Sequence, residues 1–386
     1  MTERETALQT LLTAIRPADQ AAMDRAKARQ AMLAKPPGSL GKLEDISVRL
    51  AGITGRVKNE LDQKRIIVLC ADNGVVEEGI SATPRSVTAA QAVNMTHHLT
   101  GMSAMAHHFG NEIVVVDMGI ADPYDGPAVL NRRIAPGTHN LLHEPAMTRE
   151  QAMQAILTGA ELARQAKADG VCVVGVGEMG IGNTTTSSAV LAALTGLSVE
   201  AVTGRGGGLT DAAFLKKKQV ITAALERAKP DPADVVGVLT EVGGFDLAAM
   251  CGVFLGCARE RLPVVIDGFI SIVAALCAAR LAPAAVDCFF PSHASYEIGY
   301  RAAAKELNLD PWLLLGMRLG EGSGCPIAFA VMEAACAVMN DMATFEGAAI
   351  DDGYLEEIRG GDCFTVGGRN RLHKESCPMD REHKTV

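Results

Sequence analysis

Residues 171–186 read VCVVGVGEMGIGNTTT, a short apolar run that passes directly into a glycine-rich turn. The β-branched run over 171–176 predicts a buried strand, and the hydroxyl-rich segment after Gly182 predicts the first turn of a helix. A glycine turn between a strand and a helix exposes backbone N–H groups at a helix N-terminus, and these suit a phosphate. The stretch therefore predicts an α/β fold that carries a phosphate site.

Further β-branched runs along the chain alternate with Ala-rich helical segments, a pattern typical of βαβ units and a parallel sheet. We expect six strands, at 66–70, 113–117, 171–176, 264–267, 287–290 and 313–319. We expect the intervening helices near 86–109, 148–168, 184–196, 211–228, 246–260, 269–280 and 295–307. The segment 119–146 is a long, proline-containing connection, which predicts a functional or interface loop.

Composition excludes two classes of partner. The net charge of -9 and the 4% aromatic content do not suit a protein that binds phosphate backbones or stacks bases. The longest apolar run, 268–279, falls short of the roughly 20 residues that cross a bilayer. Because the first residues are polar, we expect no secretory signal and a cytoplasmic location.

Cysteines and histidines do not predict a metal site. The ten cysteines include no CxxC pair, and most lie in apolar runs, as expected of reduced thiols in a cytosolic protein. His97–His98 and His107–His108 fall on the single helix predicted for 86–109, about 15 Å apart and too far to share an ion. Four tail residues have spacings that match no zinc pattern, namely Cys363, His373, Cys377 and His383. We therefore expect no metal and no cofactor.

Small and polar residues follow each predicted strand, among them Asp72, Glu178, Asp267, Ser292 and Glu321. The carboxyl ends of parallel strands meet at one edge of a sheet, so these residues predict a single ligand site there. Glu178 and Glu321 are framed by glycines, which suits a general base or a group that stabilises developing positive charge. Each could instead favour a helix dipole, and the two aspartates could cap the helices that follow them.

A second glycine loop, Gly204–Gly208, precedes a helix that carries Lys216, Lys217 and Lys218. An ammonium beside a glycine loop adds charge to a phosphate site, although at most one of three consecutive lysines can point inward. The chain has no Walker A sequence, so a P-loop NTPase is not expected. The two loops together predict one phosphate-bearing substrate.

The segment 175–180 also fits the GxGxxG pattern, and Glu200 lies about 20 residues beyond it. This spacing is the dinucleotide fingerprint, and it leaves an NAD-dependent oxidoreductase open as an alternative. The pattern alone is weak in a glycine-rich chain.

Five segments in chain order resemble the nicotinate-nucleotide–dimethylbenzimidazole phosphoribosyltransferase family. They are KPPGSLG at 35–41, CADNGV at 70–75, the turn at 175–185, EVGGFD at 241–246 and RLGEGSG at 318–324. The resemblance covers about residues 5–345. It implies a Rossmann-like, three-layer α/β fold with a parallel sheet and a small helical domain built from the chain ends.

On this resemblance, residues 1–60 and about 325–345 form the helical domain, and residues 61–324 form the catalytic domain. Residues 346–386 would be a polar, partly mobile tail. The family works as a homodimer, so the resemblance implies a homodimer here as well. It implies neither a nucleic-acid nor a membrane partner.

The implied activity is that of a pentosyltransferase without a cofactor. The phosphoribosyl group of nicotinate mononucleotide moves to 5,6-dimethylbenzimidazole, giving nicotinate and α-ribazole 5′-phosphate for the nucleotide loop of cobalamin, with inversion at the anomeric carbon. Glu321 matches the family's general base, and Glu178 matches its second active-site carboxylate, which would favour a ribosyl centre that becomes cationic.

The resemblance also implies three sets of binding residues. The phosphate would contact Gly177, Gly180, Gly182, Asn183, Thr184, Gly206 and Lys217. The benzimidazole would contact Thr83, Pro84, Gln91 and Met95, and the ribose or a ring would contact Asp267, Ser292 and Ser295. Position 83 carries Thr where the family pattern has Ser, so a related base or a phenol stays open as the acceptor.

Overall fold

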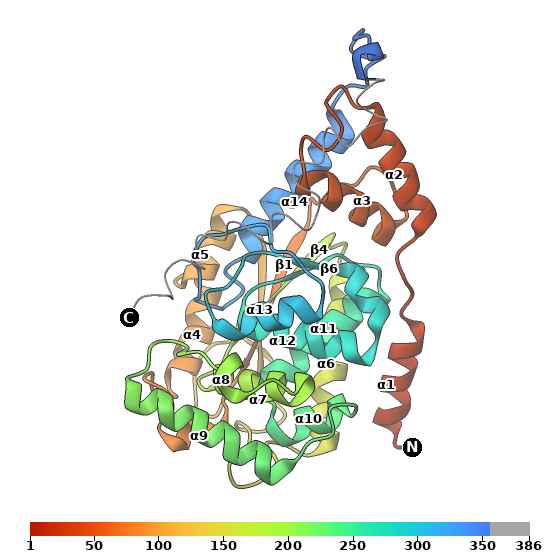
Figure 1. The fold of residues 1–386 in the computed structure, drawn as a ribbon. Coiled ribbons are helices and arrows are strands. Elements are labelled where there is room, and N and C mark those ends of the chain that lie inside the picture. The colour runs from red at the N-terminus through yellow and green to blue at the C-terminus, as the bar shows by residue number, and fades with distance from the viewer. Residues whose placement is uncertain (356–386) are drawn as a thin grey trace, which may run out of the picture.

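The structure is a computed structural model that describes residues 1–355 (Figure 1). The end of the predicted tail, with the four cysteines and histidines noted above, lies outside the described residues. No helix in the described part of the chain is both long and apolar enough to cross a bilayer.

A parallel sheet of six strands forms the centre of the molecule, as predicted. The strands are β1 (Lys64–Ala71), β2 (Glu112–Gly119), β3 (Leu130–Asn131), β4 (Val173–Met179), β5 (Val264–Ile266) and β6 (Phe289–Pro291). Their spatial order is β3-β2-β1-β4-β5-β6, the order of the doubly wound dinucleotide-binding fold. The order reverses between β1 and β4, and at this point ligands bind in such folds.

Helices surround the sheet on both sides (Figure 1). They are α4 (Val87–Thr96), α5 (Gly101–His108), α6 (Arg149–Ala168), α7 (Asn183–Thr195), α8 (Val199–Val202), α9 (Asp211–Ala228), α10 (Val235–Val242), α11 (Phe245–Arg259), α12 (Phe269–Leu281) and α13 (Ile298–Glu306). Helix α11 packs against β1, β2 and β4, and its residues 245–258 are all buried. Its nearly uniform apolar sequence is that of a core helix.

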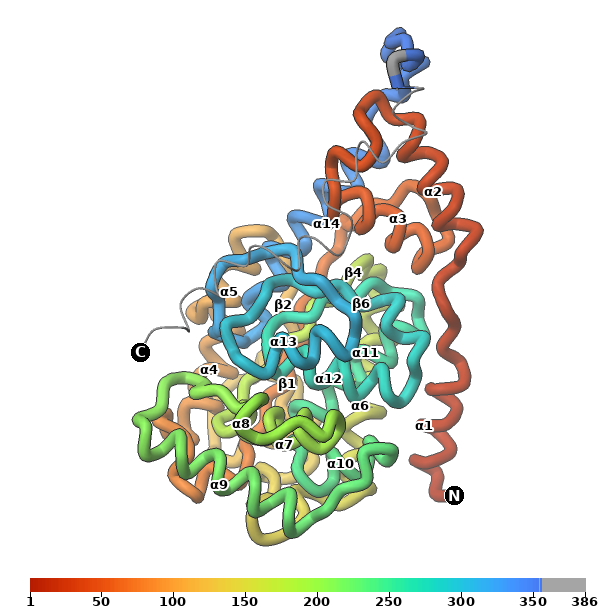
Figure 2. The backbone as a smooth tube through the Cα atoms, in the orientation of Figure 1, coloured from red at the N-terminus to blue at the C-terminus, as the bar shows by residue number. Residues whose placement is uncertain are grey.

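Segments from near the two ends of the described chain meet in a helical arm that projects from the sheet (Figure 2). The arm contains α2 (Gln20–Met32), α3 (Lys42–Thr54) and the far end of α14 (Cys325–Asp341), and α3 packs against both other helices. Arg29 donates a hydrogen bond from Nε to the carbonyl of Met339 at 2.7 Å. Helix α1 (Glu3–Ala14) lies apart from this arm, along α6 and α11.

The strand predicted over 313–319 is wrong. This segment is a loop, and its only sheet-like pairing among the described residues is a single bridge between Leu313 and His293. Gly316 has a φ of +64°, which breaks an extended run, and Leu314 and Leu315 are exposed. The sixth strand is instead β3, two residues long, inside the long connection over 119–146.

The single helix predicted over 86–109 is two helices, α4 and α5, and the distance argued for its histidines is therefore wrong. The chain turns at His98, whose φ is +60°, and Thr100 caps α5. This turn stacks the ring of His98 on that of His107, with 4.5 Å between centroids. Both histidines are exposed.

Helices α6 and α11 cross so closely that glycine is required at the contact. A Cβ atom on Gly159 would lie 1.9 Å from the carbonyl oxygen of Ala249, and one on Gly252 would lie 1.9 Å from that of Ile156. Because both obstacles are backbone atoms, no side-chain rotation can make room.

We expect Gly159→Ala to destabilise the protein by about 1–3 kcal/mol or more, since the helices must move apart. Glu161→Ala, on the exposed face of the same helix, should change stability by less than about 0.5 kcal/mol. Urea denaturation followed by circular dichroism measures both effects. Equal stability of Gly159→Ala and the unmodified protein would contradict the close crossing.

Candidate active site

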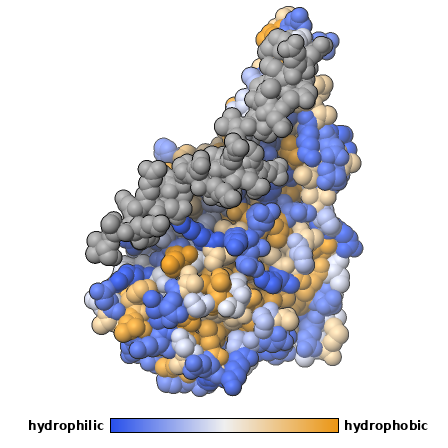
Figure 3. Space-filling view, viewed as in Figure 1, coloured by the Kyte–Doolittle hydropathy of each residue, from blue (hydrophilic) through white to orange (hydrophobic). Residues whose placement is uncertain are grey.

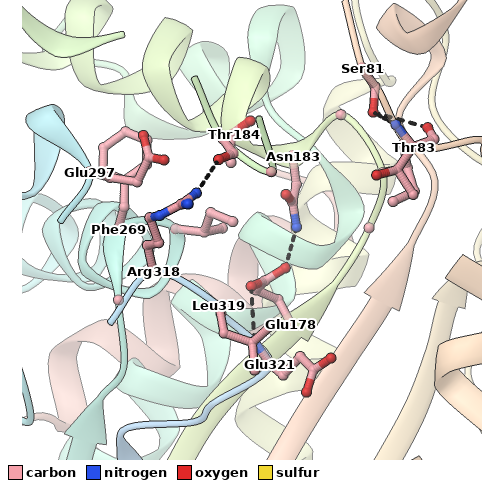
Figure 4. Close-up of a pocket in the computed structure, with 18 of the residues that line it drawn as sticks. Ser81, Thr83, Glu178, Asn183, Thr184, Phe269, Glu297, Arg318, Leu319 and Glu321 are labelled. Atoms are coloured by element: carbon pink, nitrogen blue, oxygen red, sulfur yellow. Dashed lines mark hydrogen bonds between the residues drawn. The ribbon is translucent and has the colours of Figure 1, made fainter. Parts of the chain in front are cut away.

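A cavity of about 260 Å³ opens at the carboxyl edge of the sheet, where the sequence predicts a ligand site (Figure 4). Its walls come from segments that are distant in the chain: the turn after β4, the glycine loop 204–208, the segment 293–297, and the loop before α14. Residues 80–83, between β1 and α4, close one side. The polar residues after β4 and β5 therefore contribute to one cavity.

The turn after β4 leads into α7, and no side chain caps the N-terminus of this helix. Gly182 takes the cap position with a φ of +95°, a conformation that favours glycine. A Cβ atom on Gly180 would lie 2.2 Å from the carbonyl oxygen of Ala71. Asn183 and Thr184 begin the helix and line the cavity, so a helix N-terminus faces the space where an anion can bind.

Lys217 is the one lysine of its run that points inward, as the spacing allows. Its ammonium is buried and donates hydrogen bonds to Oγ1 of Thr184 at 2.9 Å and to the carbonyl of Gly204 at 3.0 Å. Burial lowers the pKa of Lys217 to about 8, and the nearby charge of Glu297 acts in the opposite direction. Gly206 adjoins Thr184, so the two predicted glycine loops meet at this ammonium.

Glu178 lies buried at the other end of the cavity and is held by two donors. Its Oε1 accepts a hydrogen bond from the backbone N–H of Glu321 at 3.3 Å, and its Oε2 accepts one from the side-chain amide of Asn183 (Figure 4). Burial raises the pKa of Glu178 to about 8, and the charges of Asp246 and Asp267 act in the same direction. A cationic ligand beside this group would favour its ionised form.

Asp246 is a buried carboxyl beside the site, and no role was predicted for it from the sequence. It follows the glycine pair of the EVGGFD segment, in the first turn of α11, and its Oδ1 accepts a hydrogen bond from the N–H of Leu247 at 2.9 Å. Burial raises its pKa to about 6. In the sequence, the one feature that could have indicated Asp246 is its position shortly after two consecutive glycines.

Glu321 stands in a strained turn. Its φ is +64°, and its neighbours Gly320 and Gly322 have φ values of +83° and +89°. A non-glycine residue rarely adopts a positive φ. Three consecutive residues with positive φ are possible here because the residues on both sides of Glu321 are glycines. The turn directs the Glu321 carboxylate to the start of α5, where Oε2 accepts a hydrogen bond from the N–H of Met102 at 3.2 Å.

Asp267 fixes this turn through its carboxylate. Its two carboxylate oxygens accept hydrogen bonds from the N–H groups of Gly322 at 3.0 Å and Gly324 at 2.7 Å. Burial raises its pKa, while His293 and the backbone donors act in the opposite direction. Asp267 and Ser295 line the cavity, whereas Ser292 is buried outside the cavity lining and donates to the carbonyl of Asp267.

The predicted benzimidazole residues do not all reach the cavity. Thr83 and Gln91 line it, but Pro84 does not. Met95 is fully buried and belongs to the hydrophobic core. Gly177 also lies outside the cavity lining, and a Cβ atom there would be 2.3 Å from the carbonyl oxygen of Glu321, so this glycine lets the turn rest on β4.

The dinucleotide alternative finds little support in the geometry. Glu200 lies in the short helix α8 and not at the end of a strand beside β4. The acidic residues that follow the neighbouring strands are Asp72, after β1, and Asp267, after β5. The oxygens of both are already engaged by hydrogen-bond donors of the protein. Within residues 1–355, no group of three or more His, Cys, Asp or Glu side chains could hold a metal ion.

The chain is similar to known proteins over most of its length. A family model described as phosphoribosyltransferase (DBI_PRT) matches residues 15–350. The chain is 49% identical over 359 residues to the nicotinate-nucleotide–dimethylbenzimidazole phosphoribosyltransferase of Clostridium perfringens, covering 93% of this chain and 99% of that protein. It is 44% identical to the protein of the same name from Geobacter metallireducens, over 90% of this chain and 99% of that one. The crystal structure of CobT from Thermus thermophilus is 40% identical, with a TM-score of 0.83, and covers 86% of this chain and 100% of that one.

Glu178 should make stability depend on pH. Folding raises its pKa from the usual 4.5 to about 8, so the folded protein keeps a proton that the unfolded chain releases between these values. The free energy of unfolding should therefore fall as pH rises through this window, by up to about 1.4 kcal/mol per pH unit from this group.

Glu178→Gln removes this titration and should flatten the decrease in stability. We expect the variant to gain stability relative to the unmodified protein as pH rises from about 5.5 to about 8. Melting temperatures measured across this range provide the test. A parallel pH dependence in the two proteins would contradict the raised pKa.

Proposed function

The chain belongs to the phosphoribosyltransferase family, and on this premise we propose how its cavity transfers a phosphoribosyl group. The enzyme moves the phosphoribosyl group of nicotinate mononucleotide to 5,6-dimethylbenzimidazole, releasing nicotinate and α-ribazole 5′-phosphate for cobalamin synthesis. One observation carries the assignment of the site: a helix N-terminus with a buried lysine lies at one end of a single cavity, and Glu178 and Glu321 lie at the other.

The phosphate end consists of the N-terminus of α7, Gly206 and Lys217. Backbone N–H groups at a helix N-terminus and a nearby ammonium favour a phosphate. Support comes from the absence of a side-chain cap on α7 and from the ammonium's contact with Thr184. These groups would hold the 5′-phosphate, and Gly180 and Gly182 would let the backbone approach it closely.

The reaction breaks the bond between the anomeric carbon and the pyridinium nitrogen of nicotinate mononucleotide. Both electrons of this bond go to that nitrogen, so nicotinate leaves with a neutral ring and its departure needs no general acid. The acceptor's unprotonated ring nitrogen attacks the opposite face of the sugar, which inverts its configuration. The proton on the acceptor's other ring nitrogen must then leave, and Glu321 would take it.

Glu178 would act on the developing positive charge of the ribosyl centre. A buried carboxyl that is fixed by Asn183 and the N–H of Glu321 needs no rearrangement when this charge appears. The pyridinium of the bound substrate would favour the ionised form of Glu178, which burial disfavours in the free protein. Substrate binding would thus prepare the carboxylate for the step that it assists.

The acceptor would lie near Thr83 and Gln91, which line the cavity from the segment before α4 and from α4 itself. A flat ring there could reach Glu321 with its N–H group. A related base or a phenol is a second candidate acceptor, because Thr83 adds a methyl group where the family pattern has Ser. A panel of acceptors assayed under one condition separates these possibilities.

We also propose that the protein works as a cytoplasmic homodimer. Apolar side chains gather over the α8, α12 and α13 region of the face in Figure 3, and Tyr296 and Ile298 are among the exposed ones. Light scattering on the purified protein would test the assembly, and a monomer at micromolar concentration would contradict it.

The central prediction concerns Glu321. With nicotinate mononucleotide and 5,6-dimethylbenzimidazole, and without added metal, the unmodified protein should release nicotinate and form a ribazole phosphate, detected by chromatography and mass. Glu321→Gln should lower turnover by about 10²-fold or more, the usual scale for loss of a general base.

Binding of nicotinate mononucleotide by Glu321→Gln, measured by calorimetry, should match that of the unmodified protein and serves as the control. Normal turnover by this variant would remove the assignment of the base. Absence of any transfer by the unmodified protein would remove the proposed function itself.

A further inference from the structure

The cations at the phosphate end of the cavity are not equally available to a ligand. Lys217 lies close enough to Glu297 for that carboxylate to raise its pKa. Arg205 forms an ion pair with Asp211 and also donates to the carbonyl of Leu209. The charge of Arg205 is thus balanced by a carboxylate before any substrate binds, whereas the Lys217 ammonium donates its hydrogen bonds to Thr184 and Gly204.

Of the two arginines that line the cavity, Arg318 is the one without a carboxylate partner among the described residues. Its guanidinium forms no ion pair within residues 1–355, and its one hydrogen bond there runs from Nη1 to the carbonyl of Gly206 at 3.4 Å. A guanidinium has five N–H donors, and this bond is long for an N–H···O contact. Arg318 therefore brings a positive charge to the cavity that no carboxylate of the described residues balances.

Arg318 also lies between the phosphate end of the cavity and the loop that carries Glu321. It stands three residues before Glu321, on the loop that the sequence analysis mistook for a strand. In Figure 4 its side chain extends toward Thr184, while Leu319 and Glu321 lie on the other side. The backbone of this loop is tied to its neighbour by the N–H of Tyr296, which donates to the carbonyl of Met317 at 3.1 Å.

We propose that Arg318 binds the 5′-phosphate of the substrate and, by doing so, positions the loop that carries Glu321. Charge-assisted, paired hydrogen bonds from a guanidinium to phosphate oxygens are stronger than one long bond to a neutral carbonyl. The guanidinium would exchange the Gly206 carbonyl for the phosphate and link the α7 end of the cavity to the base loop. The binding energy of a remote, non-reacting phosphate would then contribute to the chemical step.

This inference rests on the proposed function, so its test compares two substrates that differ only in the phosphate. Nicotinate mononucleotide and nicotinate riboside carry the same leaving group and the same sugar. For Arg318→Ala, we expect kcat/KM with the mononucleotide to fall by about 10- to 100-fold, with kcat as well as KM affected. With the riboside, the same variant should lose less than about threefold, because the interaction needs the phosphate.

Two further variants complete the design. Arg318→Lys keeps the charge but not the paired donors, and it should fall between Arg318→Ala and the unmodified protein. Arg280→Ala, an exposed arginine outside the cavity lining that is paired with Glu306, should change kcat/KM by less than about threefold. Calorimetry with inorganic phosphate should show weaker binding to Arg318→Ala than to Arg280→Ala.

The outcomes separate the proposals. Equal losses by Arg318→Ala on the mononucleotide and the riboside would overturn the phosphate assignment. Arg318→Ala could instead keep its preference for the mononucleotide over the riboside but lose the preference for nicotinate mononucleotide over nicotinamide mononucleotide. This result would also overturn the phosphate assignment, and it would assign Arg318 to the nicotinate carboxylate. If the unmodified protein transfers nothing, the proposed function fails, and inorganic phosphate binding still decides whether Arg318 holds the anion.

Discussion

The two hydrogen bonds from Gly322 and Gly324 to the Asp267 carboxylate are the contact on which the site depends. The segment before α14 belongs to no strand or helix, so its backbone groups need partners from elsewhere in the fold. A buried carboxylate at the end of β5 supplies them and orients the turn that carries Glu321. Without these two hydrogen bonds, the turn would lose the contacts that stabilise the unfavourable φ of Glu321.

Close packing explains why glycines surround the acidic residues. Gly177 lets the turn lie directly on β4, and Gly180 lets the start of α7 approach β1. These contacts place the N–H of Glu321 within reach of Glu178, so the two carboxylates are arranged by one set of backbone contacts. The phosphate end and the acidic end of the cavity are therefore connected by turns that pack against β4 and β1.

Much of this architecture could be predicted from local patterns. The runs that form β1, β2 and β4 are apolar because both faces of a parallel sheet are covered, and glycine turns mark their carboxyl ends. The strand predicted over 313–319 was wrong because Leu314 and Leu315 are exposed, and an apolar run alone does not distinguish an exposed loop from a buried strand. The turn at His98 and the burial of Met95 depend on tertiary packing, which no local pattern records.

A crystal structure with α-ribazole 5′-phosphate and nicotinate bound would test the account most directly. The account predicts the phosphate at the N-terminus of α7, within hydrogen-bond distance of Lys217. It also predicts a ring nitrogen of the base about 3 Å from the Glu321 carboxylate. A phosphate bound elsewhere, or a base whose ring nitrogen faces a different side chain with Glu321 turned away, would contradict it.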